Sequence, residues 1–439
     1  MAAALAVAQS LGHAAFWDIE PVYTGGFASG DASIAISPTN VPSISYAAVG
    51  GLYVATKQVG HWASEFVAPV GFSGGWSSME FDAAGQPCVA YMDSSEEFTC
   101  FLKFAFRSAG VWQSETIEDA GWLPDYVSLS RDSAGRMCVA YCKTSGAQVY
   151  VRFARRIGPD NWQKETVAAV GSVTGPSLAA NGSGAIYVAF VESGSGLLKV
   201  AVRQDQGGWQ VEDVDGGAGS PAVWYPWVAV GSDGSPVVAY FVGTAGQVRL
   251  RFAGRGADSW RAETAAVLTG QIAYYCSVAV TPAGMPIIAY RDPALGCLRH
   301  AWKSGDAWRT QTIDAADGSG VRPCLRLDAL GNLHAAYVDA ADGGVRFAWT
   351  LIPLSVTDAK VMPDGRTVQL SGVVASSGAD DLASAVYVQE ADRSGGIRLR
   401  FTGPVPPVTP GMILDAQGPI ATVDGEREIL DPDLAETDR

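Results

Sequence analysis

Short runs of alternating apolar and polar residues recur along most of the chain, and each run ends in an aromatic side chain. Alternation of this kind predicts half-buried β-strands. The aromatic residues lie between 45 and 50 residues apart, at Tyr46, Tyr91, Tyr141, Phe190, Tyr240, Tyr290 and Tyr337. A constant period of this length indicates an internal repeat, in which each unit is one small supersecondary structure.

Each repeat carries signals for four short antiparallel strands. A glycine stands six residues before most of the aromatics, as at Gly85 and Gly135, and Asp or Asn precedes several of these glycines by three residues. Asp-x-x-Gly predicts a hairpin turn, because Asp caps the turn and Gly accepts a positive φ. About twenty residues after each aromatic a tryptophan begins a last strand, at Trp62, Trp112, Trp162, Trp209, Trp260 and Trp308. Four strands per repeat are typical of a propeller blade.

The last repeat lacks its fourth strand. Seven aromatic-ending strands are present, but only six tryptophan segments follow them, and the final unit ends near Trp349. The spacing Trp-x-x-Glu of the fourth strands also occurs at Trp17 and Glu20, at the start of the chain. We therefore predict an all-β, seven-bladed β-propeller over residues 15–351, closed by its N-terminal strand. An open stack of sheets or two sandwiches would leave Trp17 unexplained.

The period ends after residue 351, and five strand patterns follow within residues 352–439. They predict a small β-barrel of the OB type with an acidic C-terminal tail. The segment from Tyr387 to Arg398 resembles a domain fused to exported bacterial proteins, in which a hairpin carries a similar Asp-Arg-Ser-x-Gly-Ile turn. The resemblance covers the last fifth of the chain and implies a structural or protein-contact module, through which the chain would assemble with others.

The propeller repeats also resemble those of lectin-like, exported bacterial propellers. The segments that end at Trp162, Trp260 and Trp308, such as Gly158-Pro-Asp-Asn-Trp162, are similar to the Asp-box turns of sialidase-like proteins. Their spacing departs from the Asp-box pattern, and that turn is structural in those proteins as well.

Charge and composition exclude several classes of function. The net charge is −15, which argues against a nucleic-acid partner, since phosphate binding needs a basic surface. No apolar run reaches 18 residues, so no membrane insertion is expected. Four His and seven scattered Cys show no ligand spacing, so we expect no metal and no cofactor. Residues 1–14 are either a signal remnant or a disordered tail, and the first interpretation predicts a secreted, cell-surface or periplasmic protein.

Two sets of positions are predicted to gather at the channel mouth of the propeller. The first, which we call the mouth column, lies two residues before the serine of each first strand and comprises Asp31, Trp76, Tyr126, Gly175, Tyr225, Tyr275 and Arg322. The second column lies two residues after each repeated aromatic and includes Asp93, Glu192 and Asp339, with Arg291 beside it. Aromatic faces with a few charges suit a sugar ring, because the faces stack on C–H surfaces while the charges bind hydroxyls.

Three functions remain open from the sequence. The leading hypothesis is a non-catalytic binding or scaffold protein whose mouth takes a glycan or a partner protein. A glycoside hydrolase or polysaccharide lyase could use the carboxylates of the mouth, which would have to lie about 5–10 Å apart in a hydrolase. The third is a structural subunit of a surface assembly. No nucleophile, phosphate-loop or dinucleotide motif stands in its expected context, so no catalytic residue is nominated.

Overall fold

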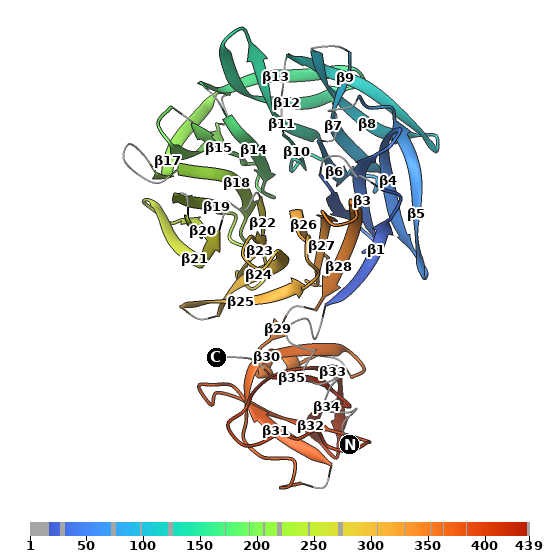
Figure 1. The fold of residues 1–439 in the computed structure, drawn as a ribbon, viewed down its shortest axis with the longest axis vertical. Coiled ribbons are helices and arrows are strands. Elements are labelled where there is room, and N and C mark those ends of the chain that lie inside the picture. Colours follow the sequence, from blue (N-terminus) through green and yellow to red (C-terminus); the bar gives the residue numbers. More distant parts are fainter. Residues whose placement is uncertain are drawn as a thin grey trace. The chain divides into compact units, whose positions relative to one another are not determined.

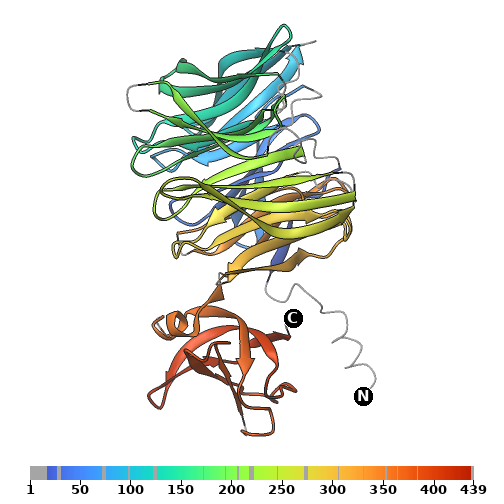
Figure 2. The same ribbon diagram turned by 90° about the vertical axis from the view of Figure 1, so that its left-hand side faces the viewer.

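The computed structural model describes residues 17–26, 31–71, 76–96, 99–121, 126–171, 173–192, 194–204, 207–216, 222–244, 246–270, 275–304, 306–329, 331–351, 353–362, 364–382 and 384–436. The chain divides into two compact units, Ile19–Trp349 and a second that contains the residues from Thr350 onward together with Trp17 and Asp18. The first unit is a ring of seven four-stranded antiparallel sheets around a channel, seen along the channel in Figure 1 and from the side in Figure 2. The predicted seven-bladed propeller is confirmed.

Six blades are each formed by four consecutive strands, and the first strand of each lies nearest the channel. Blades 1 to 3 contain β2 (Ser33–Ile36), β3 (Pro42–Ala48), β4 (Gly51–Gln58), β5 (His61–Ala68); β6 (Ser77–Phe81), β7 (Pro87–Glu96), β8 (Thr99–Ser108), β9 (Val111–Gly121); and β10 (Val127–Arg131), β11 (Met137–Ser145), β12 (Gln148–Gly158), β13 (Asn161–Val170). Blades 4 to 6 contain β14 (Val173–Ala180), β15 (Ile186–Glu192), β16 (Leu197–Arg203), β17 (Trp209–Gly216); β18 (Ala222–Val230), β19 (Pro236–Thr244), β20 (Gly246–Arg255), β21 (Trp260–Gly270); and β22 (Cys276–Val280), β23 (Pro286–Asp292), β24 (Cys297–Ser304), β25 (Ala307–Asp314).

The seventh blade joins the two ends of the propeller. It contains β26 (Val321–Leu327), β27 (Leu333–Asp339), β28 (Gly344–Thr350) and, as its outermost strand, β1 (Asp18–Tyr23). Figure 1 shows β1 beside β28, next to the first blade. The sequence prediction of closure by the N-terminal strand is therefore confirmed, and residues 1–14, interpreted as a signal remnant or tail, lie outside the described residues.

The repeated aromatics form the hydrophobic core between blades. All seven are at most 2% exposed, which fits inter-blade packing rather than ligand contact. Several tyrosine hydroxyls also bond to the preceding blade: Tyr240 donates to Asp215 (2.5 Å) and Tyr337 donates to Asp314 (2.6 Å). A buried hydroxyl without such an acceptor would be costly.

Serine hydroxyls join neighbouring blades around the channel. The first-strand serine of one blade accepts a hydrogen bond from a first-strand N–H of the next blade, at 2.9–3.0 Å. The serines are Ser33, Ser78, Ser128, Ser177 and Ser277. Trp227 in blade 5 and Cys324 in blade 7 stand at the equivalent positions.

The Trp-x-x-Glu segments join the blades at the outer edge. In blades 1 to 5 the tryptophan donates its indole N–H to the glutamate of the preceding blade, as Trp162 does to Glu115 (2.7 Å) and Trp260 does to Glu212 (2.9 Å). A basic residue of the same blade as the tryptophan completes each contact, such as Arg156 beside Glu115. Glu20 of β1 accepts from Trp62 of blade 1, so this outer belt continues across the closure of the ring.

The second unit is a closed five-stranded barrel. Its strands are β30 (Thr367–Ala375), β31 (Ala385–Gln389), β32 (Gly396–Arg400), β33 (Ile413–Val423) and β34 (Glu426–Leu430), in the order β30-β31-β32-β34-β33, and β33 pairs back to β30. The short β29 (Pro353–Leu354) and β35 (Asp433–Glu436) extend the sheet, and α2 (Val356–Lys360) packs beside it. Its buried Glu428 pairs with Arg398 and Arg400. This confirms the predicted barrel.

Two further findings concern the described residues as a whole. All seven cysteines are free thiols, and six of them are buried. No helix in the described part of the chain is long and apolar enough to cross a membrane.

Candidate functional site

The mouth column adopts an unusual backbone conformation. Gly175 has a φ of 41°, and four non-glycine residues of the column also have positive φ: Tyr126 (81°), Tyr225 (51°), Tyr275 (78°) and Arg322 (52°). Only a few per cent of non-glycine residues are left-handed. In blades 4, 5 and 7 the pairing register shifts across this position, which marks a β-bulge. Bulges re-aim side chains and are frequent beside functional sites.

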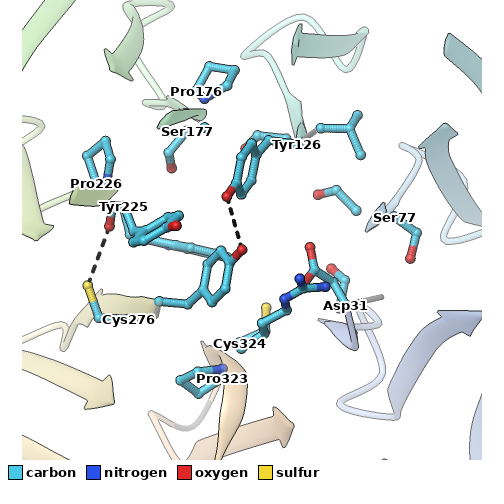
Figure 3. Close-up of a pocket in the computed structure, with 18 of the residues that line it drawn as sticks. Asp31, Ser77, Tyr126, Pro176, Ser177, Tyr225, Pro226, Cys276, Pro323 and Cys324 are labelled. Atoms are coloured by element: carbon cyan, nitrogen blue, oxygen red, sulfur yellow. Dashed lines mark hydrogen bonds and ion pairs between the residues drawn. The ribbon is translucent and has the colours of Figure 1, made fainter. Parts of the chain in front are cut away.

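The side chains of the column meet in one aromatic cluster. The hydroxyls of Tyr126 and Tyr275 hydrogen-bond at 3.0 Å, and the ring centroids of Tyr225 and Tyr275 are 4.5 Å apart. Trp76 packs against Tyr126 with centroids 4.6 Å apart. Figure 3 shows Tyr126 and Tyr225 reaching toward the centre of the channel from different blades. The structure thus brings four aromatic residues of the predicted column together.

The two charged members of the column form a pair beside this cluster. The guanidinium carbon of Arg322 lies 3.9 Å from the Trp76 ring centroid and 4.9 Å from that of Tyr275. Arg322 Nε is 3.2 Å from Asp31 Oδ1, and each side chain is 24% exposed. Stacking on aromatic faces and pairing with a carboxylate are both favourable for a guanidinium.

A cavity opens next to the cluster, inside the ring of first strands. It encloses about 650 Å³ of space that no atom fills, part of it open to solvent. All members of the mouth column except Trp76 line it, and residues one or two positions further along each first strand complete the wall. Four of these are the blade-joining serines Ser33, Ser78, Ser128 and Ser177.

Trp227 fills part of the channel. It lines the cavity from blade 5 and also packs against the buried cluster that residues of blades 1 and 7 form. The guanidinium of Arg326 lies 5.5 Å from its ring centroid. The Trp227 side chain therefore extends from blade 5 across the channel to the opposite wall, and it narrows the channel beside the cavity.

Burial and neighbouring charges fix the protonation of the site. Burial raises the pKa of Tyr126 far above its ordinary value, and burial raises the pKa of Tyr275 to about 12. Burial lowers the pKa of Arg322, but the Asp31 carboxylate and the neighbouring tyrosines outweigh that effect, so its pKa is raised overall. Both tyrosines are neutral and Arg322 is charged at neutral pH.

The second column does not join this cavity. Its carboxylates bind basic side chains of the third strand in their own blade: Asp93 with Lys103 (2.6 Å), Glu192 with Lys199 (3.7 Å) and Asp339 with Arg346 (3.3 Å). Asp339 also accepts a hydrogen bond from the backbone N–H of Ala341, as a turn cap does. None of these residues, nor Arg291, lines the cavity. Their role in ligand binding stays a prediction without geometric support.

The four serines and Trp227 line the cavity although none of them belongs to the two columns predicted from the sequence. A hydroxyl at the same position in the first strands of five blades was the signal for a polar channel wall. Trp227 replaces that serine in blade 5, and an aromatic residue at a position otherwise small or polar was the signal that the channel is filled there.

No metal cluster is evident in the described part of the chain, where no group of three or more His, Cys, Asp and Glu side chains is placed to hold an ion.

Comparison with known proteins shows similarity in fold alone. No protein-family description matches the sequence, and no curated protein is similar to it. A polysaccharide lyase, an ulvan lyase bound to -[GlcA(1-4)Rha3S]-, superposes with a TM-score of 0.52 at 11% identity over 74% of this chain and 94% of its own. A streptogramin B lyase gives 0.50 at 10% identity over 76% and 97%. A fungal alcohol oxidase in complex with copper gives 0.51 at 12% identity over 96% and 99%.

Proposed function

We propose that this protein is a non-catalytic binding protein of the cell exterior, and that its channel mouth holds a sugar residue of a glycan. The observation that supports this most is the aromatic cluster held by left-handed backbone at Tyr126, Tyr225 and Tyr275 beside the cavity. Such strain costs of order 1–3 kcal/mol per residue and is concentrated at functional sites. Packing alone would be better served by glycine, which blade 4 has at Gly175.

The chemistry of the wall suits a sugar. Tyrosine and tryptophan rings offer faces for C–H surfaces, while Asp31, Arg322 and the serine hydroxyls offer partners for hydroxyl groups. A partner protein would need a broad surface with anchor pockets, whereas the described site is one concave cavity lined by a single turn of first strands.

The carboxylates favour binding over hydrolysis. Asp31 is the only carboxylate among the described residues that line the cavity. A glycosidase generally needs two carboxylates about 5–10 Å apart, and Asp93, Glu192 and Asp339 are engaged in ion pairs away from it. A lyase that uses a tyrosinate base is also disfavoured, because the pKa values of Tyr126 and Tyr275 are raised.

Replacing Tyr225 with glycine tests the proposal without straining the fold. Glycine adopts the φ of 51° at no steric cost, so Tyr225→Gly removes the ring while the backbone relaxes. We expect glycan-array signals and calorimetric affinity to fall at least about tenfold, on the scale of 1.4 kcal/mol per tenfold change, with no loss of melting temperature. Phe66→Ala, at an exposed aromatic on β5, is the matched control and should bind as the natural chain does.

Two results would contradict this function. One is the absence of any glycan ligand for the natural chain across a broad array. The other is release of oligosaccharide products from a polysaccharide panel in a manner that Asp31→Asn abolishes, which would show that the site is catalytic.

We also propose that the chain is exported and that its barrel is of the OB type and contacts protein. The basis is the apolar run of residues 2–8 and the barrel order β30-β31-β32-β34-β33 with a parallel β32–β34 pair. Fractionation of the producing cells with N-terminal sequencing tests the first part. Cross-linking of the full chain in those cells, compared with residues 1–351 alone, tests the second.

A further inference from the structure

The charges around the cavity cancel. Asp31 and Arg322 are the only charged side chains among the nineteen described residues that line it, and they pair with each other. The other lining side chains are Tyr, Ser, Cys, Trp and small apolar residues. Because both mouth tyrosines with raised pKa values stay neutral, the wall has no net charge at neutral pH.

Arg322 is poorly placed to bind a ligand carboxylate or sulfate. Its guanidinium lies against the rings of both Trp76 and Tyr275, which cover part of its surface. Its Nε lies beside Asp31, and a ligand anion approaching there would meet the Asp31 carboxylate as well. Like charges close together in a partly buried site repel strongly, and a desolvated anion without its own cation is costly. The net charge of −15 opposes anions at long range.

The uncharged part of the wall suits hydroxyl groups. The oxygens of Ser33, Ser78, Ser128 and Ser177 accept backbone N–H bonds from the next blade. A serine hydroxyl that accepts a bond still has its own proton to donate. These serines and the Asp31–Arg322 pair therefore offer hydrogen-bond donors and acceptors to the hydroxyl groups of a ligand in the cavity.

We propose that the site selects neutral sugars and rejects uronic, sialic and sulfated sugars. This inference rests on the proposed glycan-binding function and specifies the class of its ligand. Asp31 is the determinant of that selectivity, because it neutralises the one cation in the wall.

Calorimetric titration of the full chain with matched monosaccharides tests the inference. The panel contains glucose, galactose, mannose, fucose and rhamnose, together with glucuronic acid, galacturonic acid and sialic acid. We expect at least one neutral sugar to bind about tenfold or more tightly than every acidic one, with little change between 50 and 500 mM NaCl. Weak salt dependence follows because no net charge is neutralised on binding.

A charge variant adds a second test. Asp31→Asn keeps the size of the side chain but leaves Arg322 without its counter-charge, so affinity for the acidic sugars should rise and become salt-dependent. Phe66→Ala is the control that should leave the profile unchanged. Near-ultraviolet circular dichroism shows whether the variant is folded. If it is not folded, the titrations of the natural chain by themselves test the inference.

The outcomes separate two failures. Acidic sugars that bind the natural chain as tightly as neutral ones, with affinity falling as salt rises, would overturn the neutral-sugar inference and leave glycan binding intact. No binding of any sugar by the natural chain would overturn the proposed function and this inference with it.

Discussion

His300 differs from the residue type that several other blades have at its position, and this difference is expected to cost stability at acidic pH. It occupies the third-strand position that pairs with the belt glutamate, where blades 2, 3 and 5 have Phe104, Phe153 and Phe252. In blade 6 the partner is Gln311 instead of glutamate. Burial lowers the pKa of His300 to about 4, so the imidazole is neutral inside the blade at neutral pH.

We expect His300 to make the propeller less stable as the pH falls. Because its pKa is lower in the folded state than the usual 6.5, the unfolded chain binds more protons between about pH 6.5 and 4, and stability is lost over that window. The loss is of order 3 kcal/mol, at about 1.4 kcal/mol per pKa unit. Denaturant titration at pH 5 and pH 8 should show a smaller difference for His300→Phe than for the natural chain; equal differences would show that His300 does not carry the effect.

The conformation of the mouth tyrosines could not be predicted from their own identities. Tyrosine rarely adopts a positive φ, so a sequence reader assigns these residues to ordinary loops. The available signal was Gly175 in the same column, where a Cβ would lie 2.8 Å from the ring of Tyr126. A glycine at this position in one repeat can thus indicate a positive φ at the same position in the other repeats.

Between elements, the outer belt explains why tryptophan and glutamate recur together. The sequence spacing places both on one strand, but in blades 1 to 5 the tryptophan bonds to the glutamate of the preceding blade, as Trp112 does to Glu65 (3.2 Å). The two positions therefore belong to two different interfaces. The sequence predicted the strands correctly, whereas the partners across blades depend on how sheets stack and carry no local signal.

The belt contacts differ in burial, which predicts different contributions to stability. Glu115 is 3% exposed and binds Arg156, Trp162 and the N–H of Asp160, while Glu65 is 47% exposed. Glu115→Gln leaves Arg156 without its counter-charge in a mostly buried interface and should lower the free energy of unfolding by about 3 kcal/mol. Glu65→Gln should change it by less than about 1 kcal/mol. Equal losses in urea titrations of the two variants would contradict this account.

The second column illustrates the opposite limit of sequence reading. The position of its members after the second strand predicts carboxylates at the mouth, and the structure pairs Asp93 and Asp339 with Lys103 and Arg346 of their own blades. A basic residue seven to ten positions later, on the facing strand, was the signal that these carboxylates are occupied. Charged residues at equivalent positions of a repeat therefore indicate a binding site only where the facing strand carries no residue of opposite charge.

At the scale of the whole molecule, closure is the property that the sequence predicted best. Trp17 and Glu20 match the spacing of the six other fourth strands, and β1 completes the seventh blade. The number of blades follows from the number of repeats, because each of the seven repeats of nearly equal length forms one blade. The cavity could not be derived in this way, because it depends on which side chains fill the centre, above all Trp227.

Removing the closing strand should open the ring. Deletion of residues 13–24 takes away β1, including Glu20 with its bond from Trp62, and exposes the edge of β28. We expect a loss of several kcal/mol, of which truncation of a buried tryptophan accounts for about 3–5, and concentration-dependent aggregation through the exposed edge. A chain lacking only residues 1–12 is the control. Unchanged thermal unfolding after the larger deletion would refute the role of β1.

The origin of the mouth column from separate blades has a consequence for how such a protein changes over generations. A ring that arises by duplication of one gene segment starts with identical loops and hence with a rotationally symmetric mouth. Here the loops now present Asp31, Trp76, Gly175 and Arg322 alongside three tyrosines. Since each loop is anchored in its own blade, single mutations can alter one sector of the recognition surface at a time while the scaffold remains folded, and new specificities become accessible in small inherited steps.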